Sequence, residues 1–277
     1  MVSINGLSFA YGKYKVFDNV SMKLEKGKIY GLLGENGVGK TTLLRILCGL
    51  LAPTQGQCLV DGEVPFKRNP SFYENIFFVP EDFLAPKTVV EKYALGLGEF
   101  YPNFSKEKFY SICNEFGIDV KKSFNKLSLG QQKKAIIAIA LSMQTQVLIM
   151  DEPSNGLDIP SKALLRRLIA QNAADDQLVI ISTHQVKDLE NLIDPIIIMD
   201  RGGVLVNASI EEISSRLAFT IESEKCSDAI YSQQDLRGYY TVRHNETGIE
   251  TPVDLEVLFN CALTNRTLFK HLFNNNR

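Results

Sequence analysis

The chain has 277 residues, which is enough for one large domain or two modest domains by the usual ~100–200 residues per domain. Its 30 basic and 32 acidic side chains leave a net charge of −2 with no dense lysine or arginine block, so no nucleic-acid partner is expected. Its five cysteines are never spaced as metal ligands or as a redox pair, and no stretch approaches the ~20 apolar residues that cross a bilayer, so we expect a soluble protein with reduced thiols.

Short apolar runs near the N-terminus predict strands separated by tight turns. The runs cover residues 4–10, 20–24 and 29–33, and glycine-containing turns lie between them. Two further short runs, at residues 57–60 and 76–79, also predict strands. The start of the chain is therefore expected to be rich in β-structure.

A glycine-rich segment follows the strand expected at residues 29–33 and leads into a helix that starts near Thr41. Glycines allow a tight turn whose N–H groups point at phosphate, Lys40 adds a positive charge, and the Thr41 hydroxyl suits Mg²⁺. A glycine-rich turn that binds nothing is the alternative, but the apolar strand before it and the helical spacing of leucines after it favour a nucleoside triphosphate site. The predicted binding residues are Gly34, Glu35, Asn36, Gly37, Val38, Gly39, Lys40, Thr41 and Thr42.

The middle of the chain changes to helical periods. They run from about residue 88 to residue 143 and include a helix over 105–116 that Ser105 can cap and Gly117 can end. Beyond them, apolar runs at 147–150, 178–182 and 196–199 alternate with helical stretches at 160–171 and 186–192. This alternation predicts a parallel sheet with helices on its faces. After residue 210 the pattern is too weak to assign, apart from a helix-like run over 254–273.

Two carboxylates, Asp151 and Glu152, follow the strand expected at 147–150. Open α/β sheets bind their ligands at the carboxyl ends of the strands, so these acids are expected beside the phosphate loop. Asp151 is predicted to hold Mg²⁺ next to Thr41, and Glu152 to polarise the water that attacks the γ-phosphate. An ordinary exposed turn would also carry paired acids, but the upstream phosphate loop argues against that interpretation.

The segment Leu-Ser-Leu-Gly-Gln-Gln at residues 127–132 resembles the signature motif of the ATP-binding cassette (ABC) family of ATPases. The resemblance covers residues 1 to about 208 and implies that Ser128, Gly130 and Gln131 bind the γ-phosphate of a nucleotide held by another subunit. Leu129 departs from the family pattern, which usually has glycine there. A serine-capped helix of ordinary type over residues 128–143 is the alternative.

Other segments fit the same resemblance. It implies that Tyr11 stacks on adenine with Val16 beside it, although a strand-end tyrosine that packs into the core is equally open. Residues 154–158, which include Asp158, look like the family's D-loop, which crosses the interface between two cassettes. An ordinary turn is the alternative there.

His184 looks like the family's switch histidine, within reach of the γ-phosphate, although a lone histidine is more often structural. Glu81 stands in the family's Q-loop, where glutamine is usual, and its carboxylate can still bind Mg²⁺. The predicted catalytic residues are therefore Glu152, His184 and Lys40, and the predicted metal ligands are Thr41, Glu81 and Asp151.

The predicted fold is α/β, with a P-loop NTPase core built on a mostly parallel sheet, an N-terminal antiparallel β subdomain, an inserted helical subdomain and a small C-terminal extension. A nucleotide-binding domain is expected over residues 1–215, its helical subdomain over about 85–145, and the extension over 216–277.

The resemblance implies an ATPase subunit of a membrane transporter, similar to cassettes of bacterial type-2 ABC exporters, that uses ATP and Mg²⁺. It implies a head-to-tail dimer, either a homodimer or a heterodimer with a second cassette, docked on integral membrane permease subunits at the cytoplasmic face of the cell membrane. Two alternatives stay open: a non-transport ABC ATPase that acts on ribosomes or DNA, and a regulatory cassette with weak hydrolysis.

Overall fold

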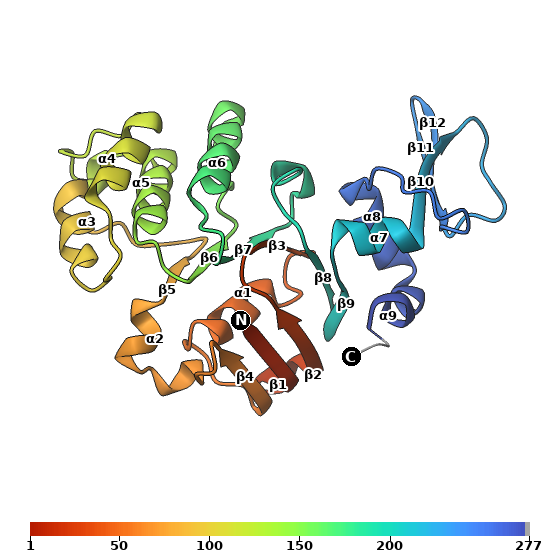
Figure 1. The fold of residues 1–277 in the computed structure, drawn as a ribbon, viewed down its shortest axis with the longest axis horizontal. Helices are drawn as coiled ribbons and strands as arrows, with labels where there is room; N and C mark the ends of the chain where they lie inside the picture. The colour runs from red at the N-terminus through yellow and green to blue at the C-terminus, as the bar shows by residue number, and fades with distance from the viewer. Residues whose placement is uncertain (275–277) are drawn as a thin grey trace.

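A six-stranded sheet forms the centre of the computed structural model, which describes residues 1–274 (Figure 1). The strand order is β5-β6-β7-β3-β8-β9, with all neighbours parallel except β8 and β9. The bounds are β3 Lys28–Leu33, β5 Ile76–Val79, β6 Val147–Asp151, β7 Leu178–Thr183, β8 Ile196–Asp200 and β9 Gly203–Ala208. The predicted parallel sheet is confirmed. Its antiparallel edge strand β9 was not predicted.

A smaller antiparallel sheet of order β2-β1-β4 packs near the N-terminus of the chain. It comprises β1 (Val2–Tyr11), β2 (Tyr14–Leu24) and β4 (Gln55–Val60). Helix α1 (Lys40–Leu47) contributes leucine and isoleucine side chains to one buried core that this sheet shares with one face of the central sheet. Burial of that apolar surface fixes the start of α1, and hence the phosphate loop, against β3.

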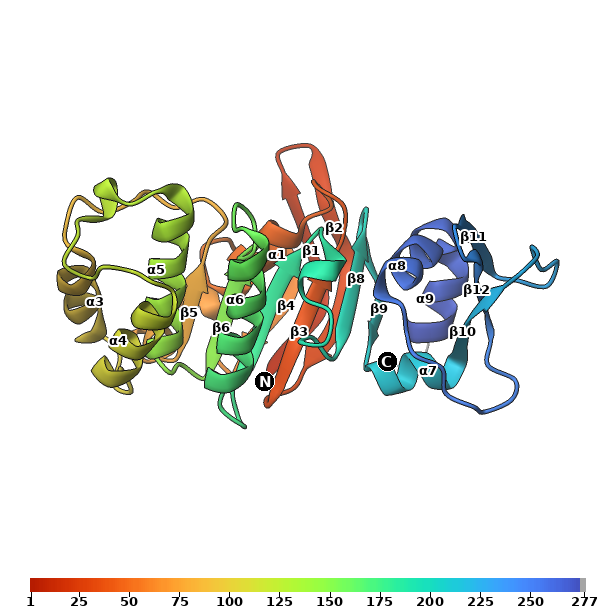
Figure 2. The same cartoon turned by 90° about the horizontal axis from the view of Figure 1, so that it is seen from above.

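Helices cover the other face of the central sheet and extend beyond β5 (Figures 1 and 2). They are α3 (Val90–Gly98), α4 (Lys106–Glu115), α5 (Leu129–Ser142) and α6 (Ile159–Asn172). Ser105 caps α4 by accepting a hydrogen bond from Lys108 N, as predicted, and Gly117 has a φ of 67° just beyond the helix. Short helices α2 (Pro70–Glu74), η1 (Pro65–Lys67) and η2 (Phe124–Lys126) complete this part of the chain.

The helix predicted over residues 186–192 is wrong. The structure has only one turn of 3-10 helix there, η3 (Val186–Asp188). Two side chains of α6 hold this turn: Lys162 Nζ lies 2.6 Å from Asp188 Oδ2, and Arg166 donates to the Asp188 carbonyl. Asn191 then adopts a left-handed φ of 65°, which a continuing helix does not allow.

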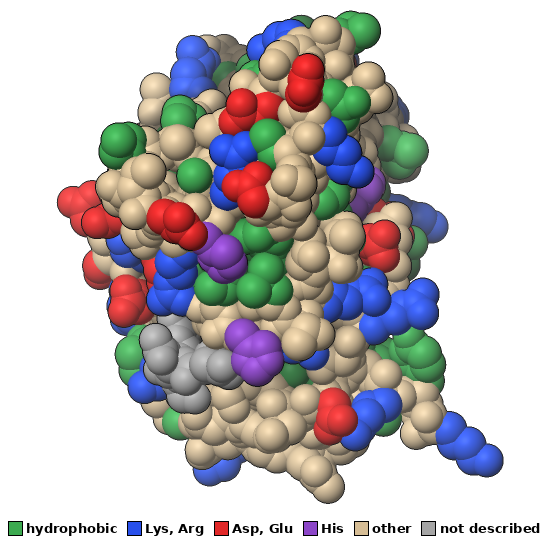
Figure 3. All heavy atoms as spheres, turned by 90° about the vertical axis from the view of Figure 1, so that its right-hand side faces the viewer, with side chains coloured by type: hydrophobic (Ala, Val, Ile, Leu, Met, Phe, Trp, Pro, Cys, Tyr) green, Lys and Arg blue, Asp and Glu red, His purple; other side chains and the backbone are tan. Residues whose placement is uncertain are grey.

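The described residues that follow β9 pack beside that strand at one end of the sheet (Figure 2). They form α7 (Ile210–Arg216), which precedes the predicted extension, then a sheet of order β10-β12-β11 and two helices. These strands, β10 (Leu217–Glu222), β11 (Tyr231–Asp235) and β12 (Gly238–His244), were not predicted. Figure 3 looks onto this unit and shows a group of hydrophobic side chains at its centre amid polar and charged ones.

The helix-like run at residues 254–273 is divided into α8 (Leu255–Thr264) and α9 (Arg266–Asn274). Asn265 separates them, and its side-chain amide donates to the carbonyls of Ile230 and Cys261. Helix α9 lies along β9, where Phe269 is fully buried and Arg266 Nε lies 2.6 Å from Asp200 Oδ2. Within residues 1–274, no helix is long and apolar enough to pass through a bilayer.

Candidate nucleotide-binding site

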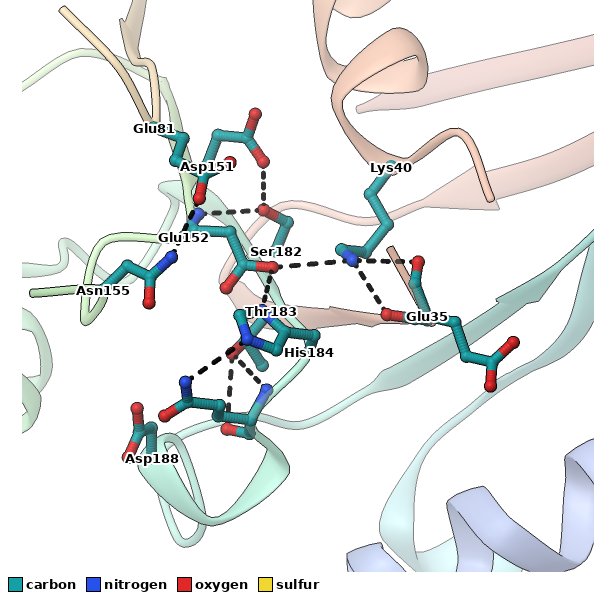
Figure 4. A network of polar contacts seen from close by, with 12 residues as sticks. Glu35, Lys40, Glu81, Asp151, Glu152, Asn155, Ser182, Thr183, His184 and Asp188 are labelled. Carbon is teal, nitrogen blue, oxygen red and sulfur yellow. Dashed lines mark hydrogen bonds and ion pairs between the residues drawn. The ribbon is translucent and has the colours of Figure 1, made fainter. Parts of the chain in front are cut away.

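The phosphate loop lies at the carboxyl end of β3, between that strand and α1. Gly39 has a φ of 112°, and a Cβ atom there would lie 2.7 Å from Val16 Cγ1, so only glycine fits. Lys40 is 6% exposed, and its Nζ donates to the carbonyls of Gly34 at 2.8 Å and Glu35 at 3.3 Å (Figure 4). The side chain thus closes the loop around its own ammonium group, where phosphate charge can be neutralised.

A hydroxyl and a carboxylate meet where α1 faces β6. Thr41 Oγ1 donates to Asp151 Oδ2 at 2.7 Å, and the Ser182 hydroxyl at the end of β7 donates to Asp151 Oδ1. Oxygen ligands of this kind suit Mg²⁺, which binds one or two protein oxygens and takes the remainder from water and phosphate. Among residues 1–274 no group of three or more His, Cys, Asp or Glu side chains is placed to hold a metal ion.

Glu152 is buried and has an unusual backbone conformation, with a φ of 46°. Its N–H donates to both the carbonyl and the hydroxyl of Ser182. Its Oε1 atom lies 3.5 Å from Lys40 Nζ and 2.9 Å from His184 Nδ1 (Figure 4). Neither Oε1 nor Nδ1 has hydrogen-bond geometry to any partner within residues 1–274, so Oε1 is held next to Lys40 and His184 by proximity and charge alone.

A cavity of about 400 Å³ opens in front of these groups. Its lining brings together predicted residues from the phosphate loop and the N-terminal sheet with the acidic residues Glu81 and Glu152. The lining residues are Tyr11, Tyr14, Val16, Asn36, Gly37, Gly39, Lys40, Thr41, Thr42, Glu81 and Glu152. The structure thus places residues far apart in the sequence around one polar-walled space of a size suited to a small ligand.

The tyrosine pair at the tip of the β1–β2 hairpin forms one wall of this cavity. Tyr11 is 46% exposed, packs edge-on against Phe9 and lies with its hydroxyl 3.5 Å from Thr42 Oγ1. Its ring therefore faces the cavity and not the core. Tyr14 is its cross-strand neighbour, and the sequence analysis did not identify it.

Glu81 also lines the cavity, at the end of β5, and its Oε1 accepts a hydrogen bond from Asn155 Nδ2 at 2.8 Å. Asn155 and Ser182 were not predicted as site residues. Ser182 is a short polar side chain at the end of β7, and that position is the signal that could have identified it; Asn155 lies within the segment 154–158 that resembles the D-loop.

The signature segment lies outside this cavity. Ser128 caps α5 in a capping box with Gln131, a geometry that fits both the signature-motif interpretation and its alternative. Asp158 caps α6 by accepting from Ser161 N. Leu129 is 84% exposed, and a Cβ atom on Gly130 would lie 3.4 Å from the Gly156 carbonyl. Ser128, Gly130, Gln131 and Asp158 therefore gather on a separate surface, and their contact with nucleotide stays a prediction.

Comparison with known proteins places this chain in a family. Residues 17–155 match the family described as ABC transporter. The bacitracin transport ATP-binding protein BcrA of Bacillus licheniformis is 33% identical over 221 residues, which are 78% of this chain and 72% of that protein. The ABC transporter ATP-binding protein NatA of Bacillus subtilis is 30% identical, with 78% of this chain and 88% of that protein covered.

Solved structures show the same fold. The ATP-binding subunit of an ABC transporter superposes with a TM-score of 0.70 at 22% identity, covering 77% of this chain and 91% of the other. The dimeric structure of MJ0796, a bacterial ABC transporter cassette, has a TM-score of 0.65 at 24% identity, covering 74% and 96% respectively.

Proposed function

Because this chain belongs to the ABC transporter family, whose ATP-binding subunits hydrolyse ATP to power transport, we propose that it drives a membrane exporter as a head-to-tail dimer. The observation that carries this proposal is the cavity where Lys40, Thr41 and Glu152 meet. Two relatives support a role in transport: BcrA is named a bacitracin transport ATP-binding protein, and SrtF of Streptococcus pyogenes, 30% identical, is named a lantibiotic transport ATP-binding protein.

The residues around the cavity have separate roles in binding and hydrolysing ATP. The loop N–H groups and Lys40 bind the phosphates, and Tyr11 stacks on the adenine ring. Thr41 and Asp151 would hold Mg²⁺, which when bound neutralises charge on the phosphate oxygens. Glu81 lines the same cavity, where its carboxylate would serve as a further oxygen ligand of Mg²⁺.

Glu152 accepts the proton of the attacking water, because its carboxylate lines the cavity beside Lys40. His184 lies 2.9 Å from that carboxylate and orients the base, and its resemblance to the family's switch histidine implies a contact with the γ-phosphate. Once the terminal phosphate is cleaved, the contacts that hold two cassettes together are lost, and the cycle acts as a mechanical switch.

The surface of the signature segment fits a second copy of this chain or a second cassette. Leu129 and Ile159, at the starts of α5 and α6, are each 84% exposed. The exposed Leu129 side chain adds bulk where the second copy would approach, so a smaller residue at that position should allow closer contact. In the closed dimer, Ser128, Gly130 and Gln131 of one copy complete the phosphate site of the other.

A groove on the opposite side of the helical subdomain suits a helix of a membrane subunit. It has a volume of about 530 Å³ and lies between α2 and the end of α3. Tyr101 places it beside β5, because its hydroxyl reaches the Ile76 carbonyl at 3.5 Å, and Glu81 follows that strand. Its lining is aromatic and proline-rich: Pro70, Tyr73, Glu74, Leu97, Glu99, Phe100, Tyr101 and Pro102.

Isolation from the native host tests this function. The tagged chain, extracted with mild detergent, should copurify with a multi-span membrane protein. Such a complex would agree with the expected position of this chain at the cytoplasmic face of the membrane. Phe100→Asp, in the groove, should release that partner while the ATPase of the isolated chain persists, because Phe100 is 72% exposed. Leu236→Asp, at a fully exposed turn of the C-terminal sheet, is the control. Recovery with ribosomes or DNA would contradict the transport function.

A further inference from the structure

A lysine that the sequence analysis did not identify lies behind the catalytic groups. Lys133 belongs to α5, is 7% exposed and projects its ammonium group between two strand ends. Its Nζ donates to the Glu152 carbonyl at 2.9 Å and to the Glu81 carbonyl at 3.1 Å. One side chain therefore joins the signature helix to the segments that follow β5 and β6.

Burial of this ammonium is costly. Desolvation lowers the pKa of Lys133, and the nearby negative charges of Glu81, Asp82, Asp151 and Glu152 act in the opposite direction. A surface lysine on an ordinary helix needs no such arrangement. Hydrogen bonds from a charged donor to buried carbonyls are stronger than neutral ones, so the two carbonyls are firmly held at this point.

The hydrogen bond from Lys133 to the Glu152 carbonyl restrains a residue whose backbone conformation is unusual. A φ of 46° is a left-handed conformation that a non-glycine residue adopts only where its surroundings impose it. Ser182 holds the N–H side of Glu152, through its carbonyl and hydroxyl, and Lys133 holds the carbonyl side. Fixed from both sides, the backbone directs the carboxylate towards Lys40 and His184.

The second bond connects this arrangement to the Glu81 segment. Glu81 lines the nucleotide cavity and is joined to Asn155 through its side chain, while its carbonyl accepts from Lys133. A shift of the Glu81 segment therefore changes the restraint on Lys133, and through Lys133 the restraint on Glu152.

We propose that Lys133 is a positioning residue for ATP hydrolysis, which holds the left-handed backbone of Glu152 and transmits movement of the Glu81 segment to that base. This inference rests on the proposed role of Glu152. Lys133 does not touch the cavity, so it acts on the rate of the chemical step and not on nucleotide affinity.

Steady-state ATPase assays of Lys133→Met test the inference, since methionine fills similar volume without a donor. We expect kcat to fall about 10- to 100-fold, as for other misplaced catalytic groups. KM and the Kd for ATP should change by less than about two-fold. Lys133→Arg keeps the positive donor and should restore activity to within about ten-fold of the wild type. Lys106→Met, on an exposed position of α4, is the matched control.

A double variant separates positioning from general destabilisation. In a Glu152→Gln background, Lys133→Met should cause no further loss in single-turnover hydrolysis, because it acts through Glu152. The inference would be overturned if the rate losses of Lys133→Met and Glu152→Gln multiply in the double variant. It would also be overturned if Lys133→Met leaves kcat unchanged, or lowers the affinity for ATP as much as it lowers kcat. If Lys133→Met does not fold, Lys133→Gln replaces it in every arm. An unchanged rate in Glu152→Gln alone would instead refute the proposed role of Glu152.

Discussion

The Lys40 ammonium and the Glu152 carboxylate lie 3.5 Å apart, and both side chains are buried. The lysine that is expected to bind phosphate is therefore next to the carboxylate that is expected to activate water. A negative charge beside Lys40 competes with phosphate for the same ammonium, so the two functions of the site are electrostatically linked.

Replacement of Glu152 by glutamine should separate these functions. The amide cannot accept the proton of water, so we expect ATPase activity to fall about 10²- to 10⁴-fold. The affinity for ATP should stay equal or rise, because the competing charge next to Lys40 is gone. Phosphate release and fluorescent-nucleotide binding measure the two effects, and Glu224→Gln in an exposed loop is the control.

The same variant should be a dimer in light scattering with saturating ATP and Mg²⁺, and chelation of the metal should return it to monomers. A protein that stays monomeric under those conditions contradicts the nucleotide-sandwiched dimer.

Leu129→Gly should strengthen ATP-dependent dimerisation. Leu129 is 84% exposed at the first position of α5, where the family pattern has glycine. Glycine at a helix position costs up to about 1 kcal/mol of folding free energy. It also removes bulk from the surface expected to meet the second nucleotide, so ATPase activity should rise several-fold. Sedimentation velocity with ATP measures dimerisation, and Leu236→Gly is the control. Weaker dimerisation would show instead that the leucine itself contributes to the contact.

Thiol labelling at about pH 8 should modify Cys226 rapidly and the other four cysteines only after denaturation, because those four are buried. Burial raises the pKa of Cys58, Cys113 and Cys261 to about 12, from an ordinary value of 9.0. The folded protein therefore keeps protons that the unfolded chain loses, and stability should decrease as pH rises from about 9 towards 12. The absorbance of the thiolate that the labelling reagent releases gives the number of cysteines that have reacted. Two or more rapid thiols in the native protein would contradict the burial.

Phe269→Ala should cost about 3–5 kcal/mol of unfolding free energy, because the ring is fully buried in the core shared with β9. Urea denaturation measures this loss, and Phe100→Ala, at an exposed position, should cost far less. Equal losses for the two variants would mean that α9 adds little to the stability of the sheet edge.

The sequence was sufficient to predict the parallel sheet, because continuous apolar runs such as residues 147–150 and 178–182 alternate with helical stretches, and such runs are typical of strands buried on both faces. The phosphate loop and the carboxylates of Asp151 and Glu152 followed from their position at strand ends. The structure places the loop and Glu152 around one cavity, with Asp151 bonded to Thr41 in its wall.

The C-terminal strands could not be predicted, because their side chains are mostly half-buried. In β10 only Leu217 is buried, and in β11 none is, so no alternation of apolar and polar residues marks them. The apolar spacing of Val186 and Leu189 did reflect burial. A single 3-10 turn held by Lys162 buries these side chains without a longer α-helix.

Lys133 illustrates a different limit. A lysine among the apolar residues of α5 is normally interpreted as a solvent-facing position, since such side chains extend to water. Only the fold shows that two backbone carbonyls, 52 and 19 residues away in sequence, converge on its ammonium. Backbone acceptors carry no sequence signal, so this contact is visible only in three dimensions.

Helix α9 lies beside β9 at the outer margin of the central sheet. An uncovered margin would offer a row of unpaired backbone groups to any passing strand, which is the usual origin of fibre growth in sheet proteins. With α9 packed there, strand pairing with a neighbouring molecule is disfavoured at this end of the sheet.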